Sequence, residues 1–484
     1  MTMLRDAKTG DVVLSDGTRL LDLIDYDKHE VALRVLSDPE IYRLELDRLF
    51  ARTWIPVAHE SEIPKVGDYV LRRVGEDPVI VVRQDSGGIE VLLNVCPHRG
   101  MQVCRSDSGN APRFKCPYHA WVFRRDGRFQ GAPFEKDMYG DALDPEYLSL
   151  ERARVELLGG MIFANFDPDA PGLDEHFGDF KWYLDLILCR TRGGYEVVGP
   201  PQRALIRSNW KGPAEQGSVD GYHGIGLHRS FTDLGLSPRG TTPATAGLLS
   251  VDISANGGGI RCMPTLPQFL DALEDGRPFE VTVDQAEQLL ADNPPVGMTT
   301  DMVPELRECL TDEQVRVLAA YYPSAGQAFP TFELLHINGP VLRDPSRSAI
   351  GDREGTTMWA GEVASTLVLH TWGPRGVDAF EIWTWVLAER DATPEMKEAA
   401  RKVAVQTFGS SGTIEMDDGE AWPSQTAAAR GARGRRVTFK YHAFRDHTPP
   451  PGWPGPGQVH TGPTGDDGQW QWWQRYFRFL SGEE

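Results

Sequence analysis

Two short motifs each pair a cysteine with a histidine: Cys96-Pro-His98 and Cys116-Pro-Tyr-His119, with seventeen residues between His98 and Cys116. Two thiolates and two imidazoles could hold one tetrahedral zinc ion. They could also hold a two-iron, two-sulfur cluster, with the thiolates on one iron and the imidazoles on the other. The residue order favours the cluster, because each motif then gives one ligand to each iron, whereas zinc sites usually pair like with like.

A second group of candidate ligands lies in Asp220-Gly-Tyr-His223-Gly-Ile-Gly-Leu-His228. Asp220 and His223 are three residues apart and would share one face of a helix. His223 and His228 are five apart, but Gly224 and Gly226 can open or end the helix between them, so that both imidazoles converge. Two histidines and one carboxylate form a triad that binds Fe(II) and leaves positions open for oxygen.

The carboxylate of such a triad has to come from a distant part of the chain. The candidates are Glu415, Asp417, Asp418, Asp378 and Glu381, and the residues alone do not choose among them. A competing interpretation is that Asp417 and Asp418 only begin a helix, where the helix dipole favours acidic side chains.

The pair CPHRG…CPYHAW closely resembles the Rieske cluster signature of the Rieske non-haem iron ring-hydroxylating oxygenases. Downstream, Phe408-Gly leads into Glu-x-Asp-Asp, which is similar to the pattern in the large (α) subunit of the aromatic-ring-hydroxylating dioxygenases. The resemblance implies a [2Fe-2S] cluster on the four Cys and His residues of the two motifs. It also implies a mononuclear Fe(II) on His223, His228 and Asp418.

The resemblance gives Asp220 a separate role. The matching carboxylate of the family hydrogen-bonds an iron-ligand histidine and a Rieske histidine of the neighbouring subunit, here His223 and the partner subunit's His119. This implies a homotrimer of α chains, with or without a β subunit (α3 or α3β3). It also implies a ferredoxin, a reductase or both as electron donor, with NAD(P)H used indirectly. The alternative is a helix-face carboxylate with no metal role.

The activity implied is that of a terminal oxygenase that uses O₂ to cis-dihydroxylate an aromatic ring. A Rieske monooxygenase or an O- or N-demethylase is the alternative within the family. An electron-transfer protein without oxygenase activity and a zinc-binding structural protein are alternatives of other classes, and the His/His/Asp group argues against the former.

The chain departs from the family pattern at the substrate pocket. Gln216 stands where Asn is common, Gly226 where a bulky residue is common, and Ile414 where a large aromatic is common. With Phe408, these residues are the predicted pocket, which we expect to accept a bulky or substituted ring. His336 and His370 lie among apolar residues and could line this pocket, although a core position is the commoner use of such histidines.

Three segments are predicted to position these residues: an N-terminal helical arm over 1–50 that belongs to the catalytic domain, an all-β Rieske domain over 51–166, and the catalytic iron domain over 167–484. The fold class is α+β, and the catalytic domain is expected to contain an antiparallel, helix-grip-like sheet flanked by helices. Apolar periodicity and turn residues predict helices over 39–54, 182–190, 211–222, 311–322 and 395–408. They predict strands over 69–74, 79–83, 89–95, 161–165, 363–370 and 380–388.

The remaining segments are less informative. Residues 271–325 are polar and are interpreted as an insertion over the active-site mouth or at a subunit contact, with surface decoration as the alternative. Pro449 to Gly457 predicts an extended arm, and the aromatic residues 470–477 a docking segment.

Composition excludes some classes of partner. The 484 residues include 50 Lys and Arg and 70 Asp and Glu, giving a net charge of −20. An acidic balance argues against nucleic acid and anionic membrane surfaces. No apolar run approaches the ~20 residues that span a bilayer. Six cysteines do not make a disulfide scaffold, and the start of the chain lacks a secretory pattern, so a reducing cytoplasm is the expected compartment.

Overall fold

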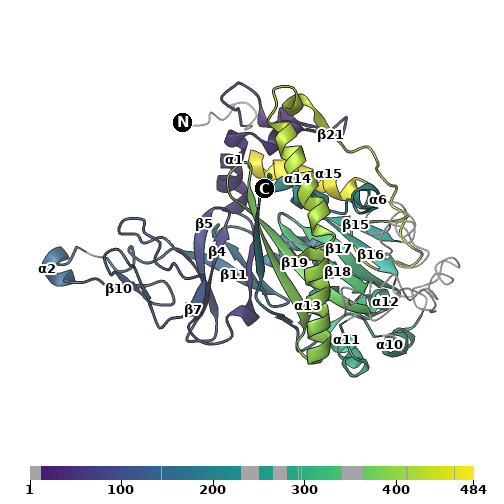
Figure 1. Ribbon diagram of the computed structural model, residues 1–484, viewed down its shortest axis with the longest axis horizontal. Helices are drawn as coiled ribbons and strands as arrows, with labels where there is room; N and C mark the ends of the chain where they lie inside the picture. Colours follow the sequence, from purple (N-terminus) through teal and green to yellow (C-terminus); the bar gives the residue numbers. More distant parts are fainter. Residues whose placement is uncertain are drawn as a thin grey trace, which may run out of the picture. The chain divides into compact units, whose positions relative to one another are not determined.

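The computed structural model describes residues 12–142, 144–229, 250–264, 281–292, 294–295, 297–340, 363–409, 412–462 and 464–484. The chain divides into two compact units (Figure 1): Glu45–Leu173, and Met1–Leu44 together with Asp174–Glu484. We call the first the Rieske unit and the second the catalytic unit, after the domains that the sequence resemblance predicts. Both Cys-His motifs lie in the first, and the Asp220 to His228 segment lies in the second.

The Rieske unit is built from antiparallel strands. Seven form one sheet in the order β3-β12-β11-β6-β5-β4-β7, and three form a small sheet in the order β10-β9-β8. The bounds are β3 Ile55–His59, β4 Asp68–Val74, β5 Asp77–Arg83, β6 Ile89–Leu93, β7 Ser108–Asn110, β8 Phe114–Lys115, β9 Val122–Phe123, β10 Phe129–Gly131, β11 Arg152–Leu158 and β12 Met161–Asn165. The strands predicted over 69–74, 79–83, 89–95 and 161–165 are confirmed as β4, β5, β6 and β12. Short helix α2 (Glu135–Tyr139) follows the small sheet.

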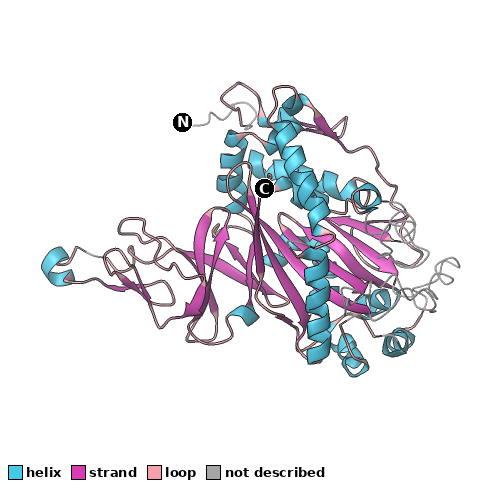
Figure 2. Ribbon diagram, in the orientation of Figure 1, coloured by secondary structure: helices cyan, strands magenta, loops and turns pink. Residues whose placement is uncertain are grey.

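The catalytic unit contains one large antiparallel sheet, with strands in the order β13-β20-β19-β18-β17-β16-β15-β22 and β14 also paired with β20 (Figure 2). The bounds are β13 Tyr195–Val197, β14 Gln202–Ile206, β15 Val251–Ala255, β16 Gly258–Pro264, β17 Tyr321–Ala328, β18 Phe332–Pro340, β19 Val363–Pro374, β20 Phe380–Glu389 and β22 Gln458–Thr461. Strands predicted over 363–370 and 380–388 are confirmed as β19 and β20. An antiparallel sheet accompanied by helices confirms the α+β class.

Helix α13 (Pro394–Phe408) packs on this sheet, as Figure 1 shows. Thr393 caps its start by accepting the N–H of Met396, and Pro394 occupies the first turn, where a missing N–H costs nothing. Its apolar face meets the sheet through a buried cluster of Val368, Val386, Ala404 and Phe408. The helix predicted over 395–408 is therefore confirmed.

Two further helices complete the part of the catalytic unit that matters for the site. Helix α14 (Glu415–Ala429) follows α13, and α15 (Asp467–Ser481) ends the chain. In α15, Trp472, Trp473 and Tyr476 are fully buried, and Trp210 lies 5.8 Å from Trp472 between ring centroids. The aromatic segment predicted to dock therefore does so within its own unit.

The N-terminal arm is less helical than predicted. Of the described residues before 51, only α1 (Pro39–Glu45) and the wide turn Leu46–Phe50 form a sustained helical segment. Strands β1 (Ile24–Asp25) and β2 (Glu30–Ala32) join β21 (Thr438–Lys440) in a three-stranded sheet. Pairing with this distant strand satisfies backbone groups that local sequence would have placed in a helix. Residues 1–11 of the predicted arm lie outside the described residues.

The helix predicted over 211–222 is shorter than expected. α5 (Lys211–Gln216) ends early, and a second short helix, α6, covers His223–Gly226. Between them Val219 has a left-handed backbone with φ of 72°, which no α-helix accepts. A break therefore comes before His223, and α6 also ends at Gly226, between the two histidines, where the glycines predicted that a helix could end.

The polar segment 271–325 forms short helices where it is described: α10 (Val283–Asp292), α11 (Leu306–Cys309) and α12 (Asp312–Ala320). The predictions over 311–322 and 182–190 are confirmed by α12 and α4 (Lys181–Leu188), which are joined by a hydrogen bond from Gln314 to the Trp182 carbonyl. Residues 271–280 lie outside the described residues.

Within the described chain, no helix has the length and apolarity needed to cross a membrane.

Candidate metal centres

The two Cys-His loops of the Rieske unit share one backbone design. Cys96 donates its N–H to the Met101 carbonyl and Cys116 to the Trp121 carbonyl, both at 2.8 Å. Each cysteine carbonyl accepts the N–H of the residue four positions on, Gly100 or Ala120. Both of these residues are left-handed, with φ of 73° and 58°. Two equivalent loops therefore each present a cysteine at their start and a histidine near their tip.

Burial separates the two kinds of ligand. Cys96 and Cys116 are 1% and 2% exposed, whereas His98 and His119 are partly exposed. The two imidazole rings lie 4.5 Å apart between centroids, and His98 stacks on Trp121 with an interplanar angle of 5°. Burial raises the pKa of the Cys96 thiol to about 11, so that a thiolate there needs a positively charged partner. This donor set fits a cluster whose cysteine iron faces inward and whose histidine iron faces outward.

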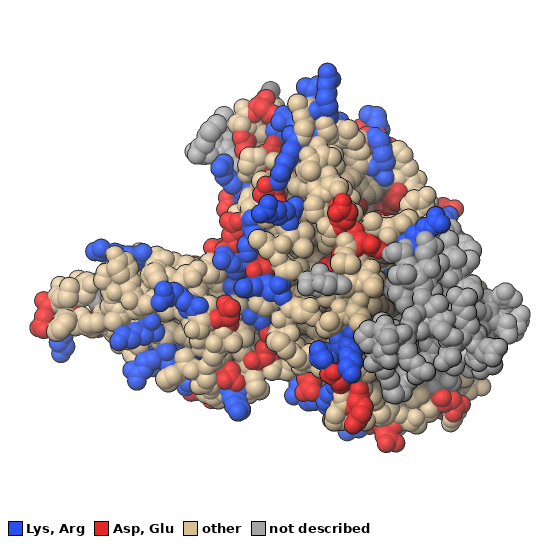
Figure 3. All heavy atoms as spheres, viewed as in Figure 1, with Lys and Arg blue, Asp and Glu red and all other residues tan. Residues whose placement is uncertain are grey.

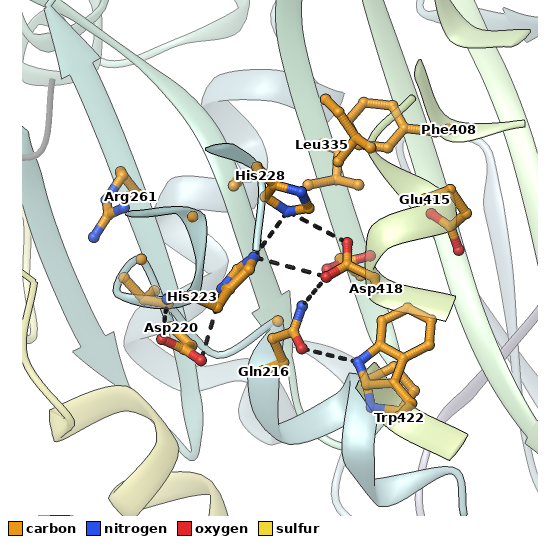
Figure 4. Close-up of a pocket in the computed structure, with 18 of the residues that line it drawn as sticks. Gln216, Asp220, His223, His228, Arg261, Leu335, Phe408, Glu415, Asp418 and Trp422 are labelled. Carbon is orange, nitrogen blue, oxygen red and sulfur yellow. Dashed lines mark hydrogen bonds and ion pairs between the residues drawn. The ribbon is translucent and has the colours of Figure 1, made fainter. Parts of the chain in front are cut away.

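The second centre lies in the catalytic unit and joins α6 to α14 (Figure 4). The Nε2 atoms of His223 and His228 are 3.1 Å apart. Asp418 places Oδ1 3.9 Å from the first and Oδ2 3.5 Å from the second. Ligand atoms that each lie roughly 2.1 Å from one metal at right angles are roughly 3 Å apart. The three groups therefore fit one ion bound on a single face, as in a two-histidine, one-carboxylate site.

The carboxyl group of Asp418 is held in place beside the two histidines. It is 7% exposed, and Gln216 donates its Nε2 hydrogen to Oδ1 across 2.7 Å. Burial raises the pKa of the Asp418 carboxyl. In the described part of the chain no lysine or arginine pairs with it. A buried carboxylate with only a neutral amide and two imidazoles beside it is the environment expected of a group that neutralises a cation.

Both histidines turn their other ring nitrogen toward a carboxylate. His228 Nδ1 lies 3.4 Å from Asp417 Oδ2, and His223 Nδ1 lies 3.6 Å from Asp220 Oδ2. Asp220 does not share a helix face with His223 as predicted; it precedes α6, and its Oδ1 accepts the N–H groups of Tyr222 and His223. Such outer carboxylates fix the tautomer and orientation of ligating histidines.

A cavity of about 300 Å³ adjoins this centre. Strands β16 to β19 form one wall, and α5, α6, α13 and α14 contribute the other. The predicted pocket residues Gln216, Phe408 and Ile414 line it, and so do His223, His228 and Asp418. Gly226 is not among the described residues that line the cavity. Of the described residues in the predicted segment 271–325, Ala325 alone lines the cavity.

Some lining residues were missed by sequence reasoning. Glu333, Leu335 and Trp372 reach the cavity from β18 and β19, and Arg261 from β16. Alternating polarity in these strands could have flagged Glu333, an acidic residue in an apolar run. Its position at the cavity follows from strand pairing that no local pattern reveals.

Comparisons with known proteins agree with this geometry. Residues 53–144 match the Rieske [2Fe-2S] domain. The chain is 31% identical to biphenyl 2,3-dioxygenase subunit alpha of Rhodococcus jostii, over 87% of this chain and 82% of that one. It is also 31% identical to N,N-dimethyl phenylurea N-demethylase subunit alpha of a Sphingobium species, over 96% of both chains.

A solved structure gives the same result. Naphthalene 1,2-dioxygenase from a Rhodococcus species, bound to indole, is 32% identical and superposes with a TM-score of 0.79, over 94% of this chain and 95% of that one. With one centre of two cysteines and two histidines and another of two histidines and an aspartate, the chain belongs to the Rieske non-haem iron aromatic-ring-hydroxylating dioxygenases, as a large (α) subunit.

Proposed function

We propose that the chain is a terminal oxygenase that adds both atoms of O₂ to one face of an aromatic ring, giving a cis-dihydrodiol. The observation that carries this is the convergence of His223, His228 and Asp418 on the wall of a cavity. The balance requires O₂, two electrons and two protons for each ring oxidised. NAD(P)H supplies the electrons through a separate reductase, with or without a ferredoxin.

One set of residues would bind the two metal centres, and another set would position the aromatic ring of the substrate. Cys96, His98, Cys116 and His119 would hold the [2Fe-2S] cluster, and His223, His228 and Asp418 the mononuclear iron. When bound, the iron supplies oxygen activation with electrons that arrive through the cluster. Gln216 orients Asp418, and Asp220 orients His223. Leu335, Phe408 and Ile414 provide apolar walls that exclude water and keep the ring in place.

The cavity volume supports a substituted or two-ring substrate. An engineered cavity of roughly 150 Å³ binds benzene, and the cavity here is about twice as large. Ile414, where the family often carries a larger aromatic, contributes to that space.

Asp220 is proposed to connect the two kinds of centre between chains. Its side chain remains 28% exposed beside His223. That leaves it accessible to the partner subunit's His119 in a ring of three chains, as the family resemblance implies. We propose an α3 or α3β3 assembly on this basis.

The electron donor is proposed to dock near the Rieske loops. Arg99 and Arg105 are exposed beside them, and Figure 3 shows several basic side chains on the face of this unit that is in view. A local basic patch on a chain of net charge −20 would attract an acidic donor. A reducing cytoplasm is the proposed compartment, because the cluster needs Cys96 and Cys116 as thiolates.

A product screen tests the reaction. Holoenzyme with a reductase, a ferredoxin, NADH and ¹⁸O₂ is supplied with one- and two-ring aromatic compounds. We expect cis-diols with two labelled oxygens. A colourless zinc protein, or one that reduces no O₂ with any substrate, contradicts the proposal.

N-demethylation is the second candidate, since the Sphingobium relative named for that reaction aligns with 96% of this chain. The same screen separates the two reactions. Demethylation inserts one labelled oxygen into a methyl C–H bond, releases formaldehyde and sends the other oxygen to water.

A further inference from the structure

One wall of the cavity carries a buried acid–imidazole pair. Glu333 on β18 and His370 on β19 are direct partners in the antiparallel register, so their side chains lie on the same face of the sheet. Glu333 Oε2 and His370 Nδ1 are 2.9 Å apart. His370 is 1% exposed, and its Nε2 has no hydrogen-bond partner among the described residues.

The other oxygen of Glu333 is fixed against the turn after α5. A side-chain carbon at Gly217 would come within 2.9 Å of Glu333 Oε1. The same added carbon would come within 2.8 Å of Gln327 Oε1, so the carboxyl group packs closely against this turn. Glu333 is thus held between the sheet and the turn that follows Gln216, where it lines the cavity.

A second carboxyl faces the same space from the opposite wall. Glu415, in the first turn of α14, lines the cavity, and with Phe408 it also lines a neighbouring cavity of about 250 Å³. Its Oε1 is buried and has no hydrogen-bond partner in the described structure. Figure 4 shows Glu415 on the Phe408 side of the metal centre, reached by none of the drawn interactions.

Few groups around Glu415 offset the cost of burying its carboxyl group. Burial raises the pKa of its carboxyl to about 7, and His370 is the one group that lowers it. The two side chains are therefore within electrostatic range of each other. A buried acceptor and a buried imidazole nitrogen that both lack partners are costly unless a ligand supplies the missing hydrogen bonds.

The charged residues of the cavity are mostly acidic. Its described lining contains the acidic residues Asp220, Glu333, Glu415 and Asp418 and one basic residue, Arg261. Arg261 is already paired with Asp252 through two hydrogen bonds of 2.8 and 2.7 Å. A metal ion would compensate Asp418, and His223 lies beside Asp220. Glu333 and Glu415 are left without a cation.

We propose that Glu415, together with the Glu333–His370 pair, recognises an N–H group on the substrate, so that the preferred ring is an arylamine or an N–H heteroaromatic. A ring bearing a carboxylate is disfavoured, because the described lining holds four acidic side chains and its one arginine is already paired with Asp252. This inference rests on the proposed oxygenase function, since it names the substrates of the same site.

Aniline and toluene form a matched pair for the test, because an amino group and a methyl group are similar in size and only the former donates hydrogen bonds. Their dissociation constants, with that of benzoate, are measured by calorimetry on anaerobic holoenzyme. A hydrogen bond to a buried carboxyl oxygen that otherwise has no partner predicts about tenfold tighter binding of aniline than of toluene. Benzoate should bind more weakly than either.

Three variants locate the effect. Glu415→Leu and Glu333→Leu roughly keep side-chain volume and remove the acceptor oxygens, and each should bring the aniline to toluene ratio toward one. Glu420→Leu, at an exposed position on the same helix, is the matched control and should leave the ratio unchanged. Cluster absorbance, iron content and circular dichroism identify a variant that has misfolded or lost its metal. In that case the binding ratio of the other carboxyl variant tests the inference.

The outcomes separate this inference from the function on which it rests. Equal binding of aniline and toluene by the wild type, or a ratio unchanged in both carboxyl variants, overturns the inference. Diol formation from toluene in that case leaves the proposed function standing. A clear aniline preference with no oxygenated product from either ring supports the recognition by Glu415 and contradicts the function.

Discussion

The side-chain amide of Gln216 donates a 2.7 Å hydrogen bond to Oδ1 of Asp418 and thereby joins α5 to α14 at the candidate metal centre. Gln216 is itself fixed, because its Oε1 accepts the indole N–H of Trp422 at 2.9 Å. The residue predicted to line the substrate pocket therefore also orients a candidate ligand. Both functions belong to one amide, since Gln216 lines the cavity as well.

Gln216→Leu should weaken iron binding. The variant keeps much of the side-chain volume but leaves Asp418 Oδ1 without its donor, and outer-shell changes of this kind cost roughly 10–100-fold in metal affinity. Trp422→Phe removes only the N–H that holds Gln216 and should have a smaller effect in the same direction. Iron content after dialysis against a graded chelator measures both. Equal iron retention by the wild type and Gln216→Leu would contradict the role.

Asp220→Asn should uncouple the two centres without unfolding the site. The amide oxygen can still accept the N–H groups of Tyr222 and His223, but the carboxylate charge beside His223 is lost. We expect both metals to be retained, the cluster to be reduced normally, and product formation to fall by about a hundredfold or more, on the order of what mispositioned groups cost. Single-turnover product yield measures the loss of product formation, and the electron paramagnetic resonance of the cluster measures whether it is still reduced. Full turnover with both metals present would remove the bridging role.

Most of the candidate ligands could be proposed from the sequence because they occur in short motifs. Asp418 illustrates how two interpretations can hold together: it occupies the first turn of α14, as the acidic helix start requires, and it also converges with His223 and His228. The family resemblance selected it among five carboxylates. No spacing rule could have done so. Asp418 is 190 residues from His228 in the sequence, and the two meet only because the strands of the large sheet lie between them in the chain.

The parts that could not be predicted depend on contacts between distant segments. The turn at Val219 ends α5 because it packs against β16, where a side chain at Gly259 would come within 2.8 Å of the Ser218 carbonyl. The helical periodicity around residue 219 does not indicate that strand β16 lies against this turn. Likewise, Glu333 and His370 meet only because β18 and β19 pair in one register out of many.

The two Rieske loops give a prediction about backbone strain. Gly100 and Ala120 occupy the same left-handed position, but only glycine adopts it without cost. Ala120→Gly should stabilise the cluster against thermal loss by up to about 1 kcal/mol, and Gly100→Ala should destabilise it by about 1–2 kcal/mol. The temperature at which cluster absorbance disappears measures both. Each variant is the control for the other, because the two loops share one backbone design, and shifts of the same sign in the two variants would contradict the prediction.

Glu215 should make the catalytic unit less stable as the pH rises. Burial raises the pKa of this carboxyl from 4.5 to about 8, and its Oε1 accepts the hydroxyl hydrogen of Tyr441 at 2.9 Å. The folded state then holds a proton that the unfolded state releases, so the free energy of unfolding falls between pH 4.5 and about 8 and is level above. The slope from this one group is at most ~1.4 kcal/mol per pH unit. Glu215→Gln resembles the protonated acid and should lose less stability than the wild type between pH 6 and pH 8, and thermal unfolding at both values tests this. An identical loss in the two proteins would show that Glu215 is ionised in the folded state.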